Sequence, residues 1–342
     1  MASPRRWPAN RRLLLVVPIA AAVVAGATAV VLHLRSGSGA SGSPVVVVAK
    51  VGSTAITSTV FDARMRSAEY AVAQGGGPQA GSPGYDTFVK GLRARVLQSL
   101  IIDAVIAEEA QFRHLAASDA DVAGEVTADA KSAGGMDKLQ AQLADVGGSL
   151  DQLRDEVRSR LNEERLQDLF AQQRAADIES RLRAGVDFGT LAGQLSDDDQ
   201  SKAKGGDLGS LGLDQLKAGD AAFAAAALAL SPGKVSDPPV RDDAGYDILR
   251  VDSATPAARN LHRILVTAPR PYTVRNRPAW FTQSVFDAIA QDCSGGRISV
   301  HLTDAGQPCG SGSPAPSPRS AAPATATTPT PTPAGAAFSP RP

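Results

Sequence analysis

The stretch 187–251 constrains the fold more strongly than any other part of this chain. It contains, in order, SDDD (196–199), SKAKGGDLG (201–209), Phe223, LALSPGKVS (228–236) and GYDILRV (245–251). A pair of glycines alone indicates only a turn. Five landmarks in a fixed order and at a fixed spacing are far more specific, and together they indicate a small domain of a definite type.

This order resembles a parvulin-type peptidyl-prolyl isomerase domain over about a quarter of the chain. The resemblance implies a small antiparallel sheet with helices. It also implies an activity in which the domain binds the X–Pro amide best in its twisted state, without covalent chemistry and without a cofactor. The proline pocket would comprise Leu208 and Phe223, with Leu216 near the third apolar position. Asp198 occupies the Cys/Asp position of the family motif S-D-[CD]. The alternative is that the apolar residues are plain core and that the acidic run is a solvated loop.

The sequence departs from the family pattern at the two histidines that line the floor of the pocket. The last family strand reads G-Y-H-I-I, and here Asp247 replaces its histidine. The first family strand, R-H-I-L-V, should lie just before residue 175, but residues 166–174 have a helical pattern. The family's histidine pair is therefore not present at its usual places.

A segment that resembles the missing first strand follows the last strand of the domain. The sequence NLHRILV (260–266) resembles the first family strand, which is the antiparallel neighbour of the last one in parvulins. We therefore expect a circular permutation joined through residues 253–259. Aligned on I-L-V, Arg263 takes the place of the other histidine and faces Asp247, while His262 points to the opposite face of the sheet.

A helical region precedes this domain. Apolar residues recur at three- and four-residue spacing through 85–112, which predicts the strongest helix, and further helices are expected over 136–143, 150–170 and 176–185. The sequences VGSTAIT (51–57) and VLQSLIIDAVIAEEA (96–110) resemble the N-terminal chaperone domain of SurA/PrsA foldases. Gly52 stands where that family has asparagine.

The predicted fold class is α+β, with one domain inserted in another. We expect a mostly helical SurA-N-like chaperone domain at 45–174, completed by a helix and a strand at 278–303, and a parvulin-like domain at 175–266. β-Branched residues predict a strand over 44–56 with a turn near Gly52. Residues 298–302 alternate like a strand and are expected to pair with 45–51.

The first residues predict a membrane anchor. Arg5, Arg6, Arg11 and Arg12 precede an apolar run at 13–34, long enough to span a bilayer as a helix. Basic residues before the run place 1–12 in the cytoplasm and the bulk of the chain outside it. The alternative is a cleaved signal peptide, with Ala25-Gly-Ala27 as the site. Residues 35–44 read as a flexible linker, and the Pro/Thr/Ser-rich segment 310–342 as a disordered tail.

Charge and cysteine content exclude some classes of function. The 35 Lys and Arg residues balance the 35 Asp and Glu residues, so there is no nucleic-acid signature. Cys293 and Cys309 are the only cysteines and do not form a metal-ligand motif. In an oxidising compartment they are expected to form a disulfide beside the strand 298–302, the alternative being two independent thiols.

The sequence leaves three functions open. The first is an extracytoplasmic, membrane-anchored folding factor that binds unfolded or nascent secreted proteins and isomerises X-Pro segments. Asp198, Asp247 and Arg263 are its candidate catalytic residues, and Leu208, Leu216 and Phe223 bind the substrate. The second is a holdase chaperone with a catalytically degraded parvulin module. The third is a cell-surface structural or adhesion protein. The loss of both histidines favours weak isomerase activity, because arginine and aspartate cannot replace a neutral hydrogen-bond network.

Overall fold

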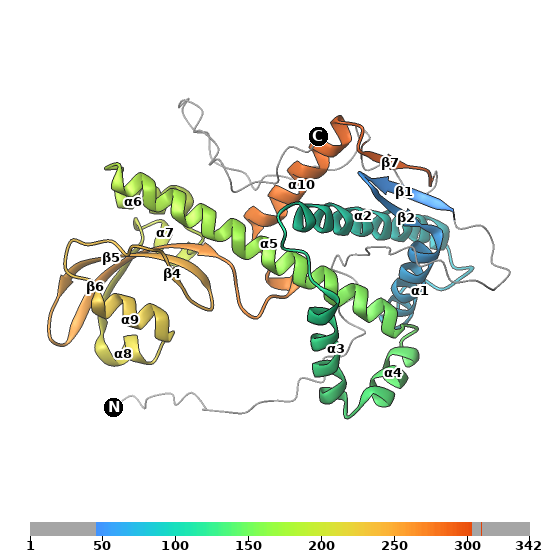
Figure 1. Cartoon of the computed structure of the whole chain (residues 1–342), viewed down its shortest axis with the longest axis horizontal. Helices are drawn as coiled ribbons and strands as arrows, with labels where there is room; N and C mark the ends of the chain where they lie inside the picture. Colours follow the sequence, from blue (N-terminus) through green and yellow to red (C-terminus); the bar gives the residue numbers. More distant parts are fainter. Residues whose placement is uncertain (1–45, 303–308, 310–342) are drawn as a thin grey trace.

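The computed structural model describes residues 46–302 and Cys309, and shows two domains joined by one long helix (Figure 1). The predicted anchor, the linker and the tail lie outside the described residues. Within the described part of the chain, no helix is both long enough and apolar enough to cross a membrane.

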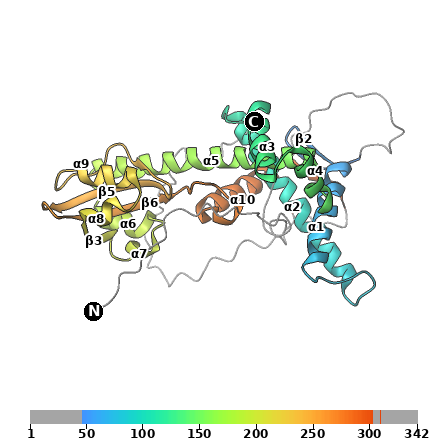
Figure 2. The same ribbon diagram turned by 90° about the horizontal axis from the view of Figure 1, so that it is seen from below.

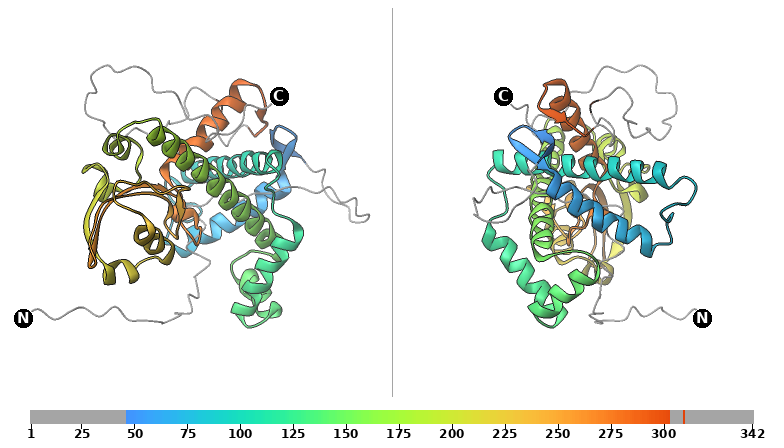
Figure 3. Two further views of the ribbon diagram at one scale, coloured as in Figure 1. Left: turned by 60° about the vertical axis from the view of Figure 1, so that its left-hand side comes forward. Right: turned by 90° about the vertical axis from the view of Figure 1, so that its right-hand side faces the viewer.

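The helical domain is built on four helices and a small sheet. Helices α1 (Ser58–Gln74), α2 (Tyr85–Phe112) and α10 (Ala279–Ser294) pack with the first half of α5 (Leu150–Arg183). The sheet has the order β2-β1-β7, from β1 (Val47–Val51), β2 (Thr54–Thr57) and β7 (Ile298–Val300). Figure 3 shows α2 crossing α5. Their shared apolar core contains side chains such as Phe61, Leu97, Ile101, Phe170 and Phe281.

The predicted hairpin and its return strand are confirmed. β1 pairs with β2 through a turn at Gly52, and β7 pairs antiparallel with the other edge of β1, with Val51 opposite Ile298. Gly52 has φ +51°, and a Cβ at this position would lie 2.4 Å from a carboxylate oxygen of Glu108. That carboxylate accepts the N–H of Ser53 at 2.9 Å. Glycine therefore fits the motif position both by its backbone conformation and by the space that Glu108 occupies.

A second helical lobe protrudes beside the start of α5. It consists of α3 (Asp119–Ala133) and α4 (Met136–Asp145), which pack on α5 through their own apolar cluster. Helix α3 begins with a capping box, because the Ser118 hydroxyl accepts the N–H of Asp121 and the Asp121 carboxylate accepts the N–H of Ser118.

The long helix α5 differs from the prediction, which placed a domain boundary and a new helix after residue 174. It runs unbroken for 34 residues and so extends ~51 Å, from the helical domain into the second domain (Figure 2). Neither glycine nor proline interrupts it. Ala171, Ala175 and Ile178 continue its apolar stripe and are buried in the core of the second domain. The two predicted helices are therefore one, shared by both domains.

The second domain is a four-stranded antiparallel sheet with helices on both faces. Its sheet has the order β3-β6-β5-β4. The elements are α6 (Phe188–Leu195), α7 (Asp199–Lys202), β3 (Asp207–Gly212), α8 (Leu213–Lys217), α9 (Ala221–Ala229), β4 (Val240–Arg241), β5 (Gly245–Ala254) and β6 (Ala258–Thr267). One face packs Ile248 and Ile264 against α5 and α6, and the other packs Leu249 and Leu261 against α8 and α9.

The segment that resembles the first family strand lies beside β5, as a circular permutation requires. β6 contains residues 260–266 and pairs antiparallel with β5 on one side and with β3 on the other. A tight turn at Thr255 joins β5 to β6, with the Thr255 N–H donated to the carbonyl of Ala258 at 2.9 Å. The connection at 253–259 is therefore short enough for the hairpin that the sequence predicts.

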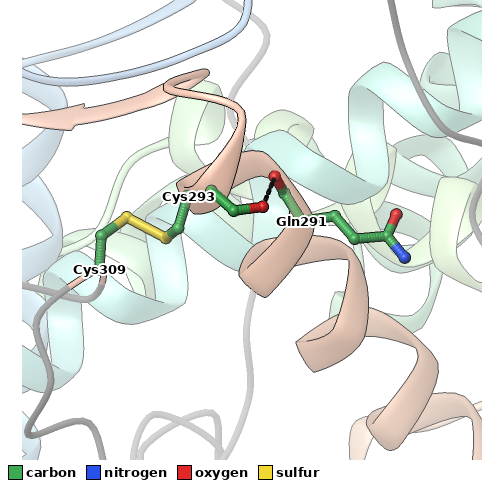
Figure 4. The surroundings of a disulfide bond; sticks show 4 residues. Gln291, Cys293 and Cys309 are labelled. Carbon is green, nitrogen blue, oxygen red and sulfur yellow. Dashed lines mark hydrogen bonds between the residues drawn. A yellow bond between two sulfur atoms is a disulfide. The ribbon is translucent and has the colours of Figure 1, made fainter.

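The chain then returns to the helical domain. After η2 (Val274–Asn276) come helix α10 and strand β7, within the segment 278–303 where a helix and a strand are predicted. Cys293, near the end of α10, is bonded to Cys309, with their Cα atoms 5.3 Å apart (Figure 4). The predicted disulfide is thus present, and it links the end of α10 to a residue that follows β7.

Candidate functional site

The predicted pairing of Arg263 with Asp247 is present on the sheet face that α9 covers. Arg263 lies directly opposite Leu249, and Asp247 is the diagonal neighbour two residues along β5. The guanidinium reaches across this diagonal: its Nε lies 2.6 Å from Asp247 Oδ1, and its Nη2 lies 3.3 Å from Oδ2. The contact is a two-pronged ion pair, the strong geometry for arginine and carboxylate.

Two further carboxylates and an aromatic ring surround the same guanidinium. Asp198 Oδ2 lies 3.9 Å from Arg263 Nη1, and Asp242 Oδ2 lies 4.0 Å from Nη2. The guanidinium carbon lies 5.6 Å from the centre of the Phe223 ring. The Asp247 side chain is fully buried, whereas 19% of Arg263 is exposed. A bound molecule can therefore reach Arg263, and also Asp198, which is 13% exposed, and the partly exposed ring of Phe223.

The acidic and glycine-rich landmarks hold β6 in place. The Ser196 hydroxyl oxygen accepts the N–H of Leu265 at 3.2 Å, and the carbonyl of Gly206 accepts the N–H of Arg263 at 2.8 Å. Asp198 in turn accepts a bond from the Ser201 hydroxyl at 2.7 Å. Gly206 has φ +84°, and a Cβ there would lie 2.4 Å from the Arg263 carbonyl oxygen. The second glycine of the pair thus allows the turn to approach the strand that carries Arg263.

Asp242 is a member of the cluster that sequence reasoning missed. It precedes β5, and its Oδ1 accepts the N–H groups of Ala244 and Gly245 at 2.8 and 2.9 Å. The other oxygen faces Arg263. The only sequence signal was an aspartate followed by a turn before the last strand, which is common to many loops.

Burial and pairing compete in the electrostatics of the ion pair. Burial raises the pKa of Asp247 to about 7, against the opposing attraction of Arg263, and Asp242 adds to the rise. Burial lowers the pKa of Arg263, but attraction to Asp247 outweighs it and the pKa is raised. Arg263 is thus a permanent cation among three carboxylates, and burial disfavours the ionised form of one of them, Asp247.

The predicted substrate residues fall into two groups. Leu208 and Phe223 are partly exposed and pack on the apolar cluster between the sheet, α8 and α9. Leu208 lies where the pairing of β3 with β6 is irregular, between Asp207 and Gly209. Leu216 is only 3% exposed and belongs to the core of that cluster. It therefore supports the apolar surface from beneath and cannot form much of its exposed part, contrary to the sequence-based expectation of a pocket residue.

His262 points away from this cluster, as predicted. Its Nε2 lies 2.8 Å from Asp252 Oδ2, and its ring meets Phe188 edge to face at 6.0 Å. The one histidine near the domain's centre is therefore on the face packed against α6. Among the described residues, no group of three or more His, Cys, Asp or Glu side chains is arranged to hold a metal ion.

Comparison with protein families identifies both regions. A family model for the PPIC-type PPIase domain matches residues 157–253, and a model for the SurA-like N-terminal domain matches residues 11–167. The chain thus combines the two domains of SurA/PrsA-type foldases. The isomerase match ends before β6 (Ala258–Thr267), so the displaced strand lies outside it.

Individual relatives match over a shorter stretch. The foldase protein PrsA of Clostridium kluyveri is 42% identical over 76 residues, which are 22% of this chain and 22% of that protein. PrsA of Geobacillus sp. is 43% identical over 77 residues, or 22% and 26%. The chain thus spans about a quarter of the length of these relatives. The crystal structure of PrsA from Streptococcus pneumoniae aligns with 74% of this chain and 94% of that one, at 14% identity and a TM-score of 0.24.

Proposed function

We propose that this chain is an extracytoplasmic folding factor that binds proline-containing segments of unfolded proteins and isomerises X–Pro bonds weakly. The domain combination and the PrsA relatives support the general role. The observation that carries the finer proposal is the ion pair of Arg263 and Asp247, which stands where the family has two histidines. Phe223 lies beside this pair and belongs with Leu208 to one apolar cluster, which is the surface that we propose for the proline ring.

The geometry explains why binding and turnover would separate. The barrier to rotation about a peptide bond is about 18–20 kcal/mol, and an isomerase lowers it by binding the twisted amide more tightly than the planar one. The apolar surface grips the ring in either state. Arg263 has two nitrogens committed to Asp247, so the cluster has little freedom to respond to the charge that shifts as the amide twists.

The experiment compares turnover with affinity in the full chain. We expect kcat/KM on an X-Pro peptide to be far below that of an ordinary parvulin, while the peptide still binds. The double variant D247H/R263H restores the family's residue types and should raise kcat more than it changes the dissociation constant. Wild-type turnover equal to that of an ordinary parvulin would contradict the proposal of weak activity.

A holdase is the second candidate, and the buried position of Asp247 favours it. A fully buried carboxylate that is paired with Arg263 is not available for a hydrogen-bond network around the amide. If the protein is a holdase, the wild type and the double variant D247H/R263H should delay aggregation of an unfolded client equally well. Loss of that protection in F223A, with wild-type protection by the double variant, would favour client binding at this surface without catalysis.

The proposal includes anchoring by residues 13–34, with the bulk of the chain outside the cytoplasm. It is supported by four arginines before the apolar run and by the extracytoplasmic role implied by the PrsA relatives. Protease added to intact cells should digest the region beyond residue 35 and spare residues 1–12. Recovery of the intact chain in the cytosol would contradict this topology.

A further inference from the structure

Asp168 lies on α5 and is the point where this shared helix holds the strands of the second domain. Its Oδ1 accepts the Nε–H of Arg241 at 2.9 Å. Its Oδ2 accepts the hydroxyl of Tyr246 at 3.2 Å and the Nη2–H of Arg270 at 3.1 Å. These donors come from β4, β5 and the segment that leads back to the helical domain. One carboxylate thus ties three parts of the second domain to α5.

Arg241 passes this constraint to the backbone of the turn before β5. Besides Asp168, its guanidinium donates to the carbonyls of Asp242, Gly245 and Ala268, the last two at 3.1 and 2.9 Å. It also lies 5.1 Å from the centre of the Tyr246 ring. Both ends of the turn 242–245 are therefore fixed by one side chain, which Asp168 holds in turn. Lysine has a single nitrogen and cannot make these bonds at once.

The same turn carries a carboxylate of the candidate site. Asp242 accepts the N–H groups of Ala244 and Gly245 with one oxygen and faces Arg263 at 4.0 Å with the other. Two residues after Gly245 comes Asp247, the main partner of Arg263. A continuous series of contacts therefore runs from α5 through Arg241 and the turn to the guanidinium at the site.

We propose that Asp168 is a positioning residue for the prolyl site, supplied by the helix that the two domains share. Through Arg241 it holds the turn 242–245, and thereby Asp242, in register with the Arg263–Asp247 pair. The helical domain thus sets the geometry of the site in the second domain. The catalytic part of this inference rests on the proposed isomerase function, whereas the positioning of the turn does not.

The test uses the full chain and three variants. D168N removes the charge and keeps the size, and R241K keeps the charge and loses the set of bonds. D177N is the matched control, because Asp177 lies on the same helix and pairs with Arg181 one turn further on, at 2.8 Å. The measurements are hydrogen exchange of the Ala244 and Gly245 amides, the global free energy of unfolding, the dissociation constant for an X-Pro peptide, and kcat.

We expect D168N and R241K to speed exchange of the two turn amides about tenfold, the size expected from losing a charge-assisted hydrogen bond. They should lower kcat while the dissociation constant and the exchange of core amides in β6 stay at the wild-type level. D177N should change none of these. If wild-type turnover is absent but the turn amides still respond, the positioning role stands and the proposed isomerase function fails.

Two results would overturn the inference. One is unchanged exchange at Ala244 and Gly245 in both variants, which would show that the bonds within the turn keep its conformation without Asp168 and Arg241. The other is a uniform loss of stability, with kcat, peptide affinity and all amides affected in proportion, because this is what a merely structural contact produces.

Discussion

Arg263 lies opposite Leu249 in the sheet but forms its ion pair with Asp247, the diagonal neighbour. A long side chain can reach across this diagonal, whereas two short ones would not meet. The two residues that the parvulin resemblance aligns with histidines are thus in direct contact in the structure. Without Arg263, the Asp247 carboxylate would be left fully buried without its main partner.

The first prediction concerns this coupling. R263A should lower the free energy of unfolding by about 3–5 kcal/mol, because it leaves the fully buried Asp247 carboxylate without its partner. D247A should cost less, because Asp198 and Asp242 still lie 3.9 and 4.0 Å from the guanidinium of Arg263. The double variant should lose far less than the sum of the two. Urea denaturation of the full chain measures all three. The control pair is D151A and R154A, an exposed ion pair on α5 with side chains 88% and 51% exposed, whose effects should be small. Strict additivity at positions 247 and 263 would show that the two residues do not interact.

The second prediction concerns pH. Burial raises the pKa of Asp247 from 3.8 to about 7 in the folded protein, so between these values the folded state binds a proton that the unfolded state has released. The contribution of this group to stability is therefore fully present below pH 4 and is lost as pH rises towards 7. Measured against D247N, which does not titrate, the wild type should become relatively less stable between pH 5 and pH 7.5. A difference that grows with pH would contradict the raised pKa.

The third prediction concerns the glycine pair beside β6. G206A places a methyl group 2.4 Å from the Arg263 carbonyl oxygen, at a backbone φ of +84°. The matched control is G209A, with φ +72° and open space around the added atom. Both substitutions carry the conformational cost of a positive φ, about 1 kcal/mol or more, but only G206A also displaces the strand. We expect G206A to be clearly the more destabilising of the two in urea denaturation. Equal losses would mean that the close approach is not a constraint.

The sequence predicted the elements of this fold better than it predicted their connections. Local signals sufficed for the hairpin at Gly52 and the helix Tyr85–Phe112, because each depends on neighbours in the sequence. The fusion of two predicted helices into α5 depends on what covers Ala171 and Ala175, which only the tertiary structure decides. The same packing explains why the helix continues through residue 174, where the sequence predicts a domain boundary.

The candidate site was predicted in part, for a similar reason. Asp247 and Arg263 were found through the family motif and the displaced strand, and the structure brings them together. Asp242 and Asp168 carry no motif, and their roles come from the turn and the helix that happen to face the cluster. Leu216 matched the expected apolar type, but its depth in the core depends on the packing of α8, which spacing alone does not determine.

The last prediction separates the exposed apolar residues from the buried one. F223A removes a partly exposed ring that lies beside Arg263, so it should weaken binding of an X-Pro peptide while the free energy of unfolding changes little. L216A removes a side chain that is only 3% exposed, and it should cost about 2–5 kcal/mol of stability through the cavity left behind. At a temperature where L216A remains folded, its peptide affinity should stay close to that of the wild type. Fluorescence anisotropy with a labelled X-Pro peptide measures the affinities, and urea denaturation measures the stabilities. If F223A binds the peptide as tightly as the wild type does, the apolar surface beside Arg263 is not the binding site. In that case the proline pocket carried over from the parvulin resemblance is wrong for this chain.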